Sequence, residues 1–431
     1  MAQIRDPIHG SIEVTADETA LIDAPFYQRL RNVMQLGFTV LAFPGGTHTR
    51  YSHGVGAMQV ASRCCDALPT NLLPPEDRAR FRQALRIAVL THDIGHAPLS
   101  HASEAIMCPR GKLGLPAWTG GPNENERRAN HEDYTLKILL DSEFARTIEQ
   151  KFGEKGISPE SVAGLITGRH APGHESDFMS GTTDWAPLLR QLVSSELDAD
   201  RMDYLQRDSF YTGVSYGRYD LDWLATNLTV VERDGAAYLA LAKRAIFAFE
   251  DFLLSRYHMF VSVYYHYTPI CFDNMLTRYY AEAPGEYEIP TDIEKYLDHD
   301  DVALTARLRE SRNRWAQAIV RRRPWRMVAE INEMDRGYDI AALNKALAAE
   351  KIEAFETESK GILSKYFGKK DGPRLYVHDP GTGRYTPVEE YTPLYERYAN
   401  TLRINRIYVD PDRYDAARSI VRKATGADLA S

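Results

Sequence analysis

Cysteine is scarce in this sequence, with four in 431 residues. They are Cys64, Cys65, Cys108 and Cys271, and no two of them form a C-x-x-C pair. Adjacent cysteines such as Cys64 and Cys65 are poor disulfide partners. We therefore expect reduced, buried thiols and a cytoplasmic protein.

Long apolar runs and an excess of positive charge are also missing. No stretch of about 18 apolar residues occurs, so the sequence predicts no membrane-spanning helix. The start, MAQIRDPIHG, has no apolar stretch after its charge, so we expect no signal peptide. The formal net charge of −8 argues against a stable nucleic-acid partner, because phosphate backbones favour basic surfaces. A few local arginines would still suffice to hold a small anionic substrate.

What remains is the composition of a globular protein, with 44% hydrophobic and 26% charged residues. The length of 431 residues favours one large domain and a smaller one. Residues from about 20 to 275 have mostly helical patterns. In 81–90 the apolar side chains recur at the spacing of a buried helical stripe, and 53–68 has small and apolar residues suited to close helix packing.

Two longer segments continue this pattern. Leucines recur in helical register through 187–209, and 252–276 is an apolar and aromatic helix candidate in which Pro269 predicts a kink. Loops rich in Gly and Pro are expected at 109–122 and 284–292.

Beyond about residue 365, short β-prone runs alternate with turn residues. We therefore predict a mainly α fold, a helical bundle with a smaller α+β C-terminal part. The expected division is 1–280 for the main domain and 281–431 for a region that is first helical and then α+β.

A short run, AVLTHDIGHAPLSH at 88–101, concentrates histidines behind an apolar lead-in. His92 and Asp93 fall at the end of the predicted buried helix, and imidazole with carboxylate suits Mn, Fe, Zn or Mg. A single His-Asp pair is more often just a hydrogen-bonded couple. His53, at the start of another predicted helix, is the candidate third ligand.

A carboxylate from a distant helix is needed to complete such a site. Asp200, Tyr204 and Asp208 are spaced i, i+4, i+8 and share one helix face, and Asp200 is the candidate fourth ligand. The simpler interpretation of Asp198 and Asp203 is that they are solvated helix charges.

The order His53, His92-Asp93, Asp200 resembles the H…HD…D signature of the HD-domain phosphohydrolases. The segments DPIHG, FPGGTHTRYSHGVGAM, THDIGHAPLSH and DADRMDYLQRDS resemble the deoxynucleoside triphosphate triphosphohydrolase branch. The likeness covers roughly residues 3 to 275, and the SAM domain that the mammalian enzyme adds is not present. This resemblance implies an HD-type bundle with a divalent metal (Mn, Fe, Mg, Zn or Ni) on His53, His92, Asp93 and Asp200.

The reaction implied by the resemblance is cleavage of a dNTP into a deoxynucleoside and inorganic triphosphate. His101 would be the general acid and Glu104, where the family usually has Asp, would orient it; His96 would face phosphate. His101 as a structural cap is the alternative. Matching substrate positions, for phosphates or sugar, are Gln35, Arg50, His131, Arg201, Tyr204, Asp208, Arg256 and Tyr264.

Each of these positions has a plainer interpretation, such as surface ion pairs for Arg50 and Arg256 and a core role for Tyr264. The family's histidine near the base and sugar is replaced by Phe260, which leaves the substrate range open.

A second site is implied near the N-terminus. Asp23, Gln28 and Arg31 match residues that read a guanine nucleotide activator, GTP or dGTP, although the same residues suit an amphipathic helix with ion pairs. The cluster RRRPWR at 321–326 would hold activator phosphates or form a solvated basic turn. The family's habit favours a homo-oligomer, a dimer or tetramer.

Two alternatives stay open. One is an HD-type phosphohydrolase that acts on a monophosphate, a cyclic dinucleotide or an alarmone. The other is a nucleotide sensor with vestigial catalysis, against which the complete set of His53, His92, Asp93, Asp200 and His101 argues.

Overall fold

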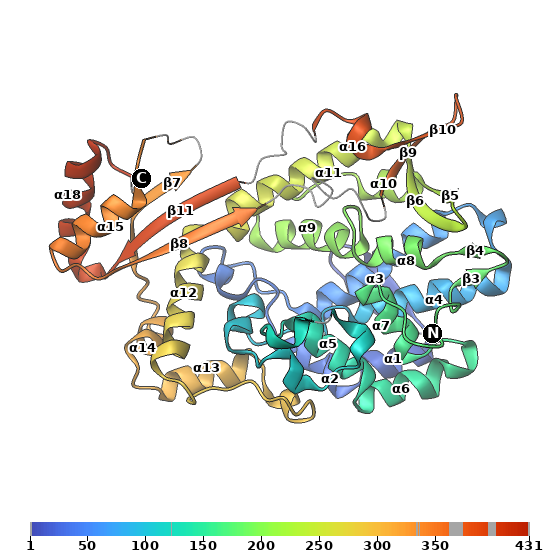
Figure 1. Ribbon diagram of the computed structural model, residues 1–431, viewed down its shortest axis with the longest axis horizontal. Helices are drawn as coiled ribbons and strands as arrows, with labels where there is room; N and C mark the ends of the chain where they lie inside the picture. Colours follow the sequence, from blue (N-terminus) through green and yellow to red (C-terminus); the bar gives the residue numbers. More distant parts are fainter. Residues whose placement is uncertain are drawn as a thin grey trace.

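A computed structural model describes residues 2–121, 123–332, 335, 337–361, 374–394 and 402–429. Most of the chain forms a helical body, and a smaller sheet with two helices extends from one end of it (Figure 1). The predicted mainly α fold with an α+β C-terminal part is confirmed. The boundary near residue 280 stays a prediction.

Three helices at the centre of the body carry the metal-ligand candidates. They are α3 (Arg50–Ala67), α4 (Pro75–Thr91) and α9 (Ala199–Thr212), and α3 packs against both others. Glycines in α3 permit this close packing, since a Cβ at Gly54 would lie 2.6 Å from the Tyr27 hydroxyl and 3.0 Å from the carbonyl of Leu90. The end of α4, the end of the apolar stripe, therefore lies beside the start of α3.

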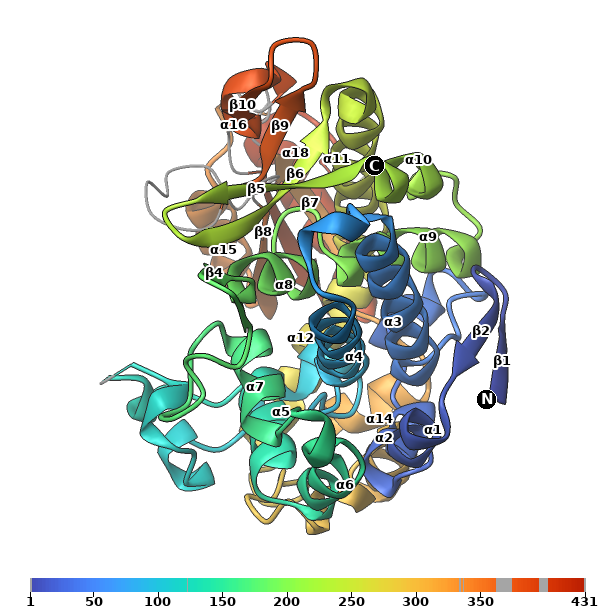
Figure 2. The same ribbon diagram turned by 90° about the vertical axis from the view of Figure 1, so that its right-hand side faces the viewer.

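The helices around this centre are shorter. α1 (Ala16–Ile22) and α2 (Pro25–Arg29) follow an N-terminal hairpin of β1 (Ala2–Asp6) and β2 (Gly10–Val14), and the hairpin lies at the side of the body (Figure 2). The others are α5 (His131–Leu140), α6 (Glu143–Phe152), α7 (Pro159–Thr167), α8 (Ala186–Val193), α10 (Leu221–Thr226), α13 (Asp301–Glu310) and α14 (Arg314–Val320).

Two predicted helices are interrupted. The segment 187–209 divides into α8 and α9, and Asp198 caps α9 by accepting a hydrogen bond from the Arg201 N–H at 2.8 Å. The segment 252–276 divides into α11 (Ile246–Met259), a short π-helix (Phe260–Tyr264) and α12 (Tyr267–Glu282). Pro269 lies in the first turn of α12, where a proline removes no helical hydrogen bond, so the predicted kink is wrong and the break comes before it.

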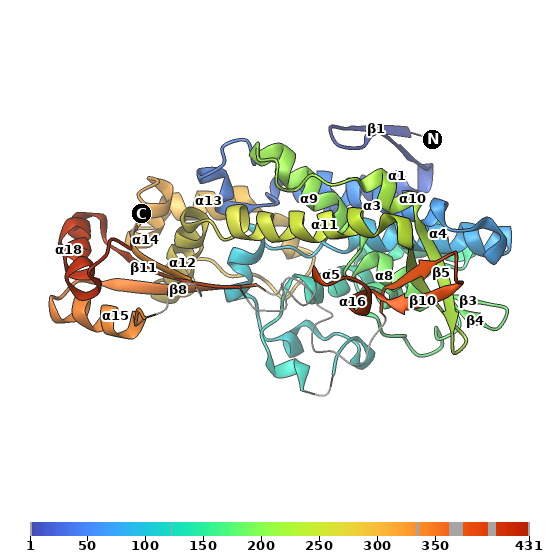
Figure 3. The same cartoon turned by 90° about the horizontal axis from the view of Figure 1, so that it is seen from above.

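The helical body also contains strands that the sequence patterns did not predict. β5 (Leu228–Arg233) and β6 (Ala236–Ala242) form a hairpin, and β9 (Tyr376–Asp379) returns from the C-terminal part to pair in parallel with β6. β10 (Arg384–Pro387) and the short strands β3 (Met179–Ser180) and β4 (Thr183–Asp184) complete a six-stranded sheet beside α16 (Val388–Tyr391). Figure 3 shows this sheet at one end and the C-terminal lobe at the other, with α11 running between them.

The C-terminal lobe has a three-stranded antiparallel sheet in the order β7 (Arg326–Asn332), β11 (Leu402–Val409), β8 (Ala354–Gly361). Helices α15 (Ile340–Ala349) and α18 (Tyr414–Thr425) share a small apolar core with it. Among the described residues, no helix is long and apolar enough to cross a membrane. All four cysteines are free; Cys64, Cys65 and Cys271 are buried as predicted, whereas Cys108 is half-buried.

Candidate active site

The four predicted metal ligands meet at one point. His53 Nε2 lies 3.0 Å from Asp200 Oδ1 and 3.7 Å from Asp93 Oδ2. His92 Nε2 lies 3.4 Å from Asp200 Oδ1 and 3.5 Å from Asp93 Oδ1. We call His53, His92, Asp93 and Asp200 the metal quartet; α3, the end of α4 and the start of α9 supply its members.

The histidines of the quartet are oriented by their other ring nitrogens. His53 Nδ1 donates to Asp203 Oδ2 at 2.8 Å, and His92 Nδ1 donates to the Val89 carbonyl at 2.7 Å. In the neutral form of each ring Nε2 then presents a lone pair, and both Nε2 atoms are buried without a hydrogen bond. Lone pairs and carboxylate oxygens that face each other at such distances repel unless a cation lies between them, so the donor set fits a divalent metal.

The charge around the quartet also favours a bound cation. Burial lowers the pKa of His53 and of His92, but the neighbouring carboxylates outweigh it and raise them to about 10 and about 9. Asp93 also binds the Arg50 guanidinium, and its pKa is held well below the usual value. The site thus stabilises positive charge, which a metal ion would supply in place of protons.

Asp203 is a buried supporting residue and not a solvated charge. Its side chain is 0% exposed and accepts from His53, from His9 Nε2 at 2.6 Å and from Arg207. Arg207 in turn donates to Asp6 Oδ2 at 2.8 Å. The DPIHG motif of the N-terminal hairpin therefore reaches the quartet through Asp203. Asp198 is likewise buried, so the interpretation as solvated charges is wrong for both.

A second group of titratable side chains lies beside the quartet. Glu104 Oε1 accepts from His101 Nδ1 at 3.2 Å and from His131 Nδ1 at 2.6 Å, and the His131 ring stacks on His96 at 3.9 Å. We call these four residues the acid cluster. His96 Nε2 lies 3.2 Å from Asp93 Oδ1, so the two groups adjoin, and His131 does fold back across the 109–122 excursion.

The acid cluster is more open than the quartet, with the His101 side chain 66% exposed. Burial raises the pKa of Glu104, but His101 and His131 outweigh it and hold it far below the usual value, so Glu104 is a carboxylate. Burial, with Arg50 and His131, keeps the pKa of His96 well below its usual value, so His96 is neutral. The acid cluster and three members of the quartet, His53, His92 and Asp93, each have the composition and spacing to hold a metal, but in the acid cluster the carboxylate already bonds two histidines.

The predicted sugar-contacting residues include two tyrosines near the quartet. Tyr264 donates to Asp208 Oδ2 at 2.7 Å, and the Tyr204 ring lies 6.2 Å from Tyr264 and 6.4 Å from His53. Gln35 is buried and its Oε1 has no partner. Phe260 contacts Tyr264, with ring centroids 5.0 Å apart, so the position of the replaced histidine lies beside a predicted sugar-contacting residue.

Three predicted phosphate-binding arginines are buried ion-pair partners. Arg50 binds Asp93 and donates to Ser100 Oγ at 3.1 Å. Arg201 lies 3.0 Å from Asp198, and Arg256 lies 2.7 Å from Glu196. Their burial excludes the interpretation of Arg50 and Arg256 as surface ion pairs.

The turn before His101 is strained and is held from outside the HD-type bundle. Leu99 and Ser100 have φ of 56° and 58°, a region that non-glycine residues seldom adopt. Asp301 of α13 accepts from the Leu99 N–H at 2.6 Å and from the Met34 N–H at 2.9 Å. One carboxylate thus fastens both the turn before His101 and the residue before Gln35. The sequence offered no signal for this contact across 202 residues.

The candidate activator residues form an exposed patch. Arg31 Nε donates to Gln28 Oε1 at 2.8 Å and its guanidinium lies 3.6 Å from the centre of the Tyr51 ring, while Asp23 is exposed nearby. Part of the RRRPWR cluster, Arg321, Arg323 and Trp325, lines a separate hollow of about 220 Å³.

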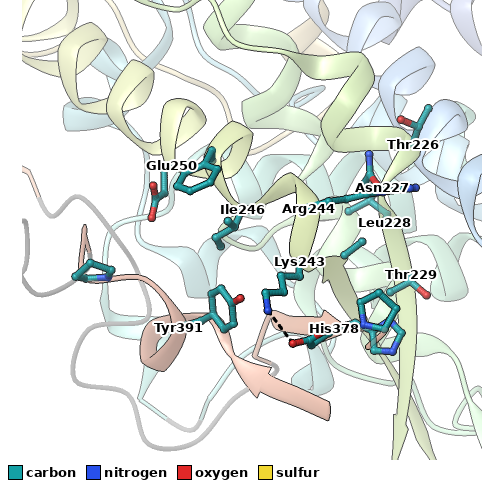
Figure 4. A pocket seen from close by; sticks show the side chains of 15 residues that line it. Thr226, Asn227, Leu228, Thr229, Lys243, Arg244, Ile246, Glu250, His378 and Tyr391 are labelled. Atoms are coloured by element: carbon teal, nitrogen blue, oxygen red, sulfur yellow. Dashed lines mark hydrogen bonds and ion pairs between the residues drawn. The ribbon is translucent and has the colours of Figure 1, made fainter. Parts of the chain in front are cut away.

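Another pocket, of about 870 Å³, lies between the β5–β6 hairpin, the start of α11 and the β9–β10 hairpin (Figure 4). Lys243 crosses it to pair with Asp379 at 2.9 Å. Its lining includes no member of the quartet or the acid cluster, so it is not the candidate active site.

Comparison with known proteins agrees with this geometry. A family model described as HD domain matches residues 50–208, and one described as HD associated region matches 219–349. The chain thus carries an HD domain followed by an HD-associated region. The HD match begins at Arg50 and ends at Asp208, so it encloses the metal quartet and the acid cluster, whereas Asp301 falls in the associated region.

Curated relatives of this HD-domain protein include an uncharacterised protein of Methanocaldococcus jannaschii, 30% identical over 75% of this chain and 58% of its own length. The deoxynucleoside triphosphate triphosphohydrolase SAMHD1 of Homo sapiens is 27% identical over 67% of this chain and 46% of its own. The chain thus spans about half the length of these relatives.

Solved structures match nearly the whole chain. A hypothetical protein from Aquifex aeolicus has a TM-score of 0.75 at 25% identity, covering 97% of this chain and 99% of that one. A phosphohydrolase from Bacteroides thetaiotaomicron has the same fold, with a TM-score of 0.68 at 19% identity over 95% and 99% of the two chains.

Proposed function

We propose that this protein is a metal-dependent dNTP triphosphohydrolase that converts a dNTP into a deoxynucleoside and inorganic triphosphate. One observation carries the proposal: two buried histidine Nε2 atoms without hydrogen bonds face two carboxylates, directly beside an exposed histidine backed by a carboxylate. The first group suits a divalent metal, and the second suits proton transfer to a leaving group. Relatives named deoxynucleoside triphosphate triphosphohydrolases support this substrate class.

The metal, when bound by the quartet, would polarise a phosphoryl oxygen and lower the pKa of water. Water attacks the α-phosphorus and loses a proton to the solvent, the bond from phosphorus to the 5′ oxygen breaks, and His101 gives its proton to that oxygen and is then protonated again from the solvent. Glu104 orients the His101 ring through Nδ1 and compensates its positive charge. Hydrolysis by this route consumes one water and needs no other reactant.

The remaining residues bind the substrate in this proposal. Arg50, His96, His131, Arg201 and Arg256 line the phosphate side, where cationic and N–H donors offset the triphosphate charge. Asp208 accepts a hydrogen bond from the 3′-hydroxyl of the sugar. Tyr264 packs beneath the sugar and crowds a 2′-hydroxyl, with Gln35 and Tyr204 at its edges.

Regulation is a further part of the proposal. Gln28 and Arg31 already bond each other on the surface, and with Asp23 they offer donors and an acceptor for the edge of a guanine. We propose a GTP or dGTP activator at this patch and a homo-oligomer, dimer or tetramer. The metal is one of Mn, Fe, Mg, Zn and Ni.

The test is incubation with each dNTP and NTP, with Mn or Mg, with and without added GTP or dGTP, and separation of the products by chromatography. Inorganic triphosphate and deoxynucleoside are expected. Monophosphate or pyrophosphate products would contradict the proposal in favour of another HD-type phosphohydrolase. Oligomeric state is read in parallel by light scattering with and without GTP.

A further inference from the structure

His48 lies behind the proposed sugar-binding carboxylate. Its Nε2 is 2.7 Å from Asp208 Oδ1, and because an ionised carboxylate can only accept, His48 donates this bond. Tyr264 donates to the other oxygen at 2.7 Å. Both oxygens of Asp208 are thus held, one by each neighbour, and the plane of the carboxylate is fixed.

The His48 ring itself is tightly located. It is 4% exposed and stacks on Tyr211, with ring centroids 4.5 Å apart and planes at 21°. Nδ1 is buried and has no hydrogen-bond partner, which suits a neutral ring with its hydrogen on Nε2. Among the residues that the structure describes, the ring therefore has one polar contact, and that contact is Asp208.

The main chain of His48 reaches a second sugar-side residue. Its carbonyl accepts from the Gln35 N–H at 3.0 Å, and the Arg50 N–H donates to the Val33 carbonyl at 2.9 Å. Residues 33–35 and 48–50 thus run together as a short backbone pairing. One residue connects Gln35 through its backbone with Asp208 through its side chain.

Close approach of this loop to α9 depends on glycine. A Cβ on Gly45 would lie 2.3 Å from the Tyr211 carbonyl, so any larger residue would push the loop and His48 away from the helix. The sequence PGGTH places this glycine three residues before His48.

We infer that His48 is a positioning residue for sugar recognition, which acts through Asp208 on the 3′-hydroxyl of the substrate. This rests on the proposed function. When the carboxylate is held in one plane, a 3′-hydroxyl meets an oriented acceptor. Without His48, only Tyr264 holds the Asp208 carboxylate, its plane is less fixed, and the hydrogen bond to the sugar weakens.

The experiment compares a dNTP with its 2′,3′-dideoxy counterpart, which lacks the hydroxyl that Asp208 would accept. We measure kcat and KM for both substrates with wild-type protein, His48→Ala and His48→Gln. His48→Ala should lower kcat/KM for the dNTP about tenfold, as expected for one lost hydrogen bond, and leave the dideoxy substrate within about twofold. His48→Gln keeps an N–H donor and should restore part of the dNTP rate.

Thr47→Ala, an exposed neighbour on the same loop, is the matched control and should change neither substrate. Equal losses on both substrates in His48→Ala would overturn the inference and indicate a structural role, as would no loss on either. If His48→Ala does not fold, as judged by its melting curve, the kcat/KM values of His48→Gln decide. A loss confined to the dNTP, or rates near wild type on both substrates, supports donation to Asp208, and equal losses on both substrates overturn it.

Failure of the proposed function has a different signature. If wild-type protein releases triphosphate from no dNTP, the proposed reaction and this inference fall together. If wild-type protein is active but its preference for the dNTP over the dideoxy substrate is the same in His48→Ala, only the inference falls.

Discussion

The metal quartet and the acid cluster are built from the same kinds of side chain, yet they are held differently. In the quartet each histidine is fixed through Nδ1 by a partner that turns Nε2 toward the shared point. In the acid cluster one carboxylate serves two histidines, and His101 stands mostly in solvent on a short turn. Rigid, buried lone pairs suit an ion that stays bound, whereas an exposed ring with one carboxylate partner suits a proton that comes and goes.

The largest effect should come from removing the quartet. Asp93→Ala takes away one ligand and leaves the Arg50 guanidinium buried without its carboxylate, so we expect bound metal to be lost and turnover to fall by about 10⁴-fold or more. Metal content by elemental analysis and turnover should fall together. A variant that keeps full metal content would contradict the assignment of Asp93.

His101→Ala should distinguish the role of the acid cluster from that of the metal quartet. Loss of a general acid costs roughly 10²- to 10⁴-fold in kcat, while the quartet and its metal content should be unchanged. Glu104→Gln, which keeps the shape but removes the charge beside His101, is expected to have a smaller effect of the same kind. If metal content falls with His101→Ala, the acid cluster is itself part of the metal site, and the distinction between the groups fails.

Asp203→Asn tests whether orientation of His53 matters for metal affinity. The amide keeps one oxygen but loses the charge that accepts from three neighbours, so the metal should bind about 10- to 100-fold more weakly. Titration of metal-free protein gives this value, and excess metal should restore most turnover. Asp222→Asn, at an exposed ion pair with Arg63, is the control and should leave metal affinity unchanged.

The smallest effect concerns the turn that precedes His101 of the acid cluster. In Asp301→Asn a single amide oxygen must replace two carboxylate oxygens, so either the Leu99 or the Met34 N–H loses its acceptor. We expect kcat to fall about fivefold, equivalent to roughly 1 kcal/mol, with metal content unchanged. A loss of metal with this variant would mean that the α13 contact supports the quartet instead.

The Asp301 carboxyl also predicts a pH dependence of protein stability. Burial raises the pKa of Asp301 to about 6, above its value in the unfolded chain, so folding favours the neutral carboxyl. This contribution is full below about pH 4 and is lost as the pH rises through 6. The free energy of unfolding of wild-type protein should therefore fall by about 1–2 kcal/mol relative to that of Asp301→Asn between pH 4 and pH 7. This is less than the full pKa difference would give, because Asp301 is only half-buried. Denaturant titrations of both proteins at each pH measure it.

The contrast between the groups also shows what sequence patterns could predict. His92, Asp93 and Asp200 were predictable because a helical stripe ends at His92 and a helix face carries Asp200. Asp203 was not, because its i+3 place beside Asp200 resembles any helical charge, and only the packing of α3 on α9 buries it. The strands β5 and β6 were missed because β9, about 140 residues later, supplies a neighbour in the sheet.

The contact between Asp301 and Leu99 links the candidate site to a residue outside the matched HD domain. The HD match at 50–208 holds every candidate ligand, yet the acceptor that closes the turn before His101 lies in the associated region. A fragment cut to the matched residues would keep the ligands but lack this acceptor, and Leu99 and Ser100 would be released from a costly backbone conformation. Substitutions on α13 therefore offer a way to adjust the proposed proton donor, His101, from a distance, without changing any residue that is proposed to bind the substrate.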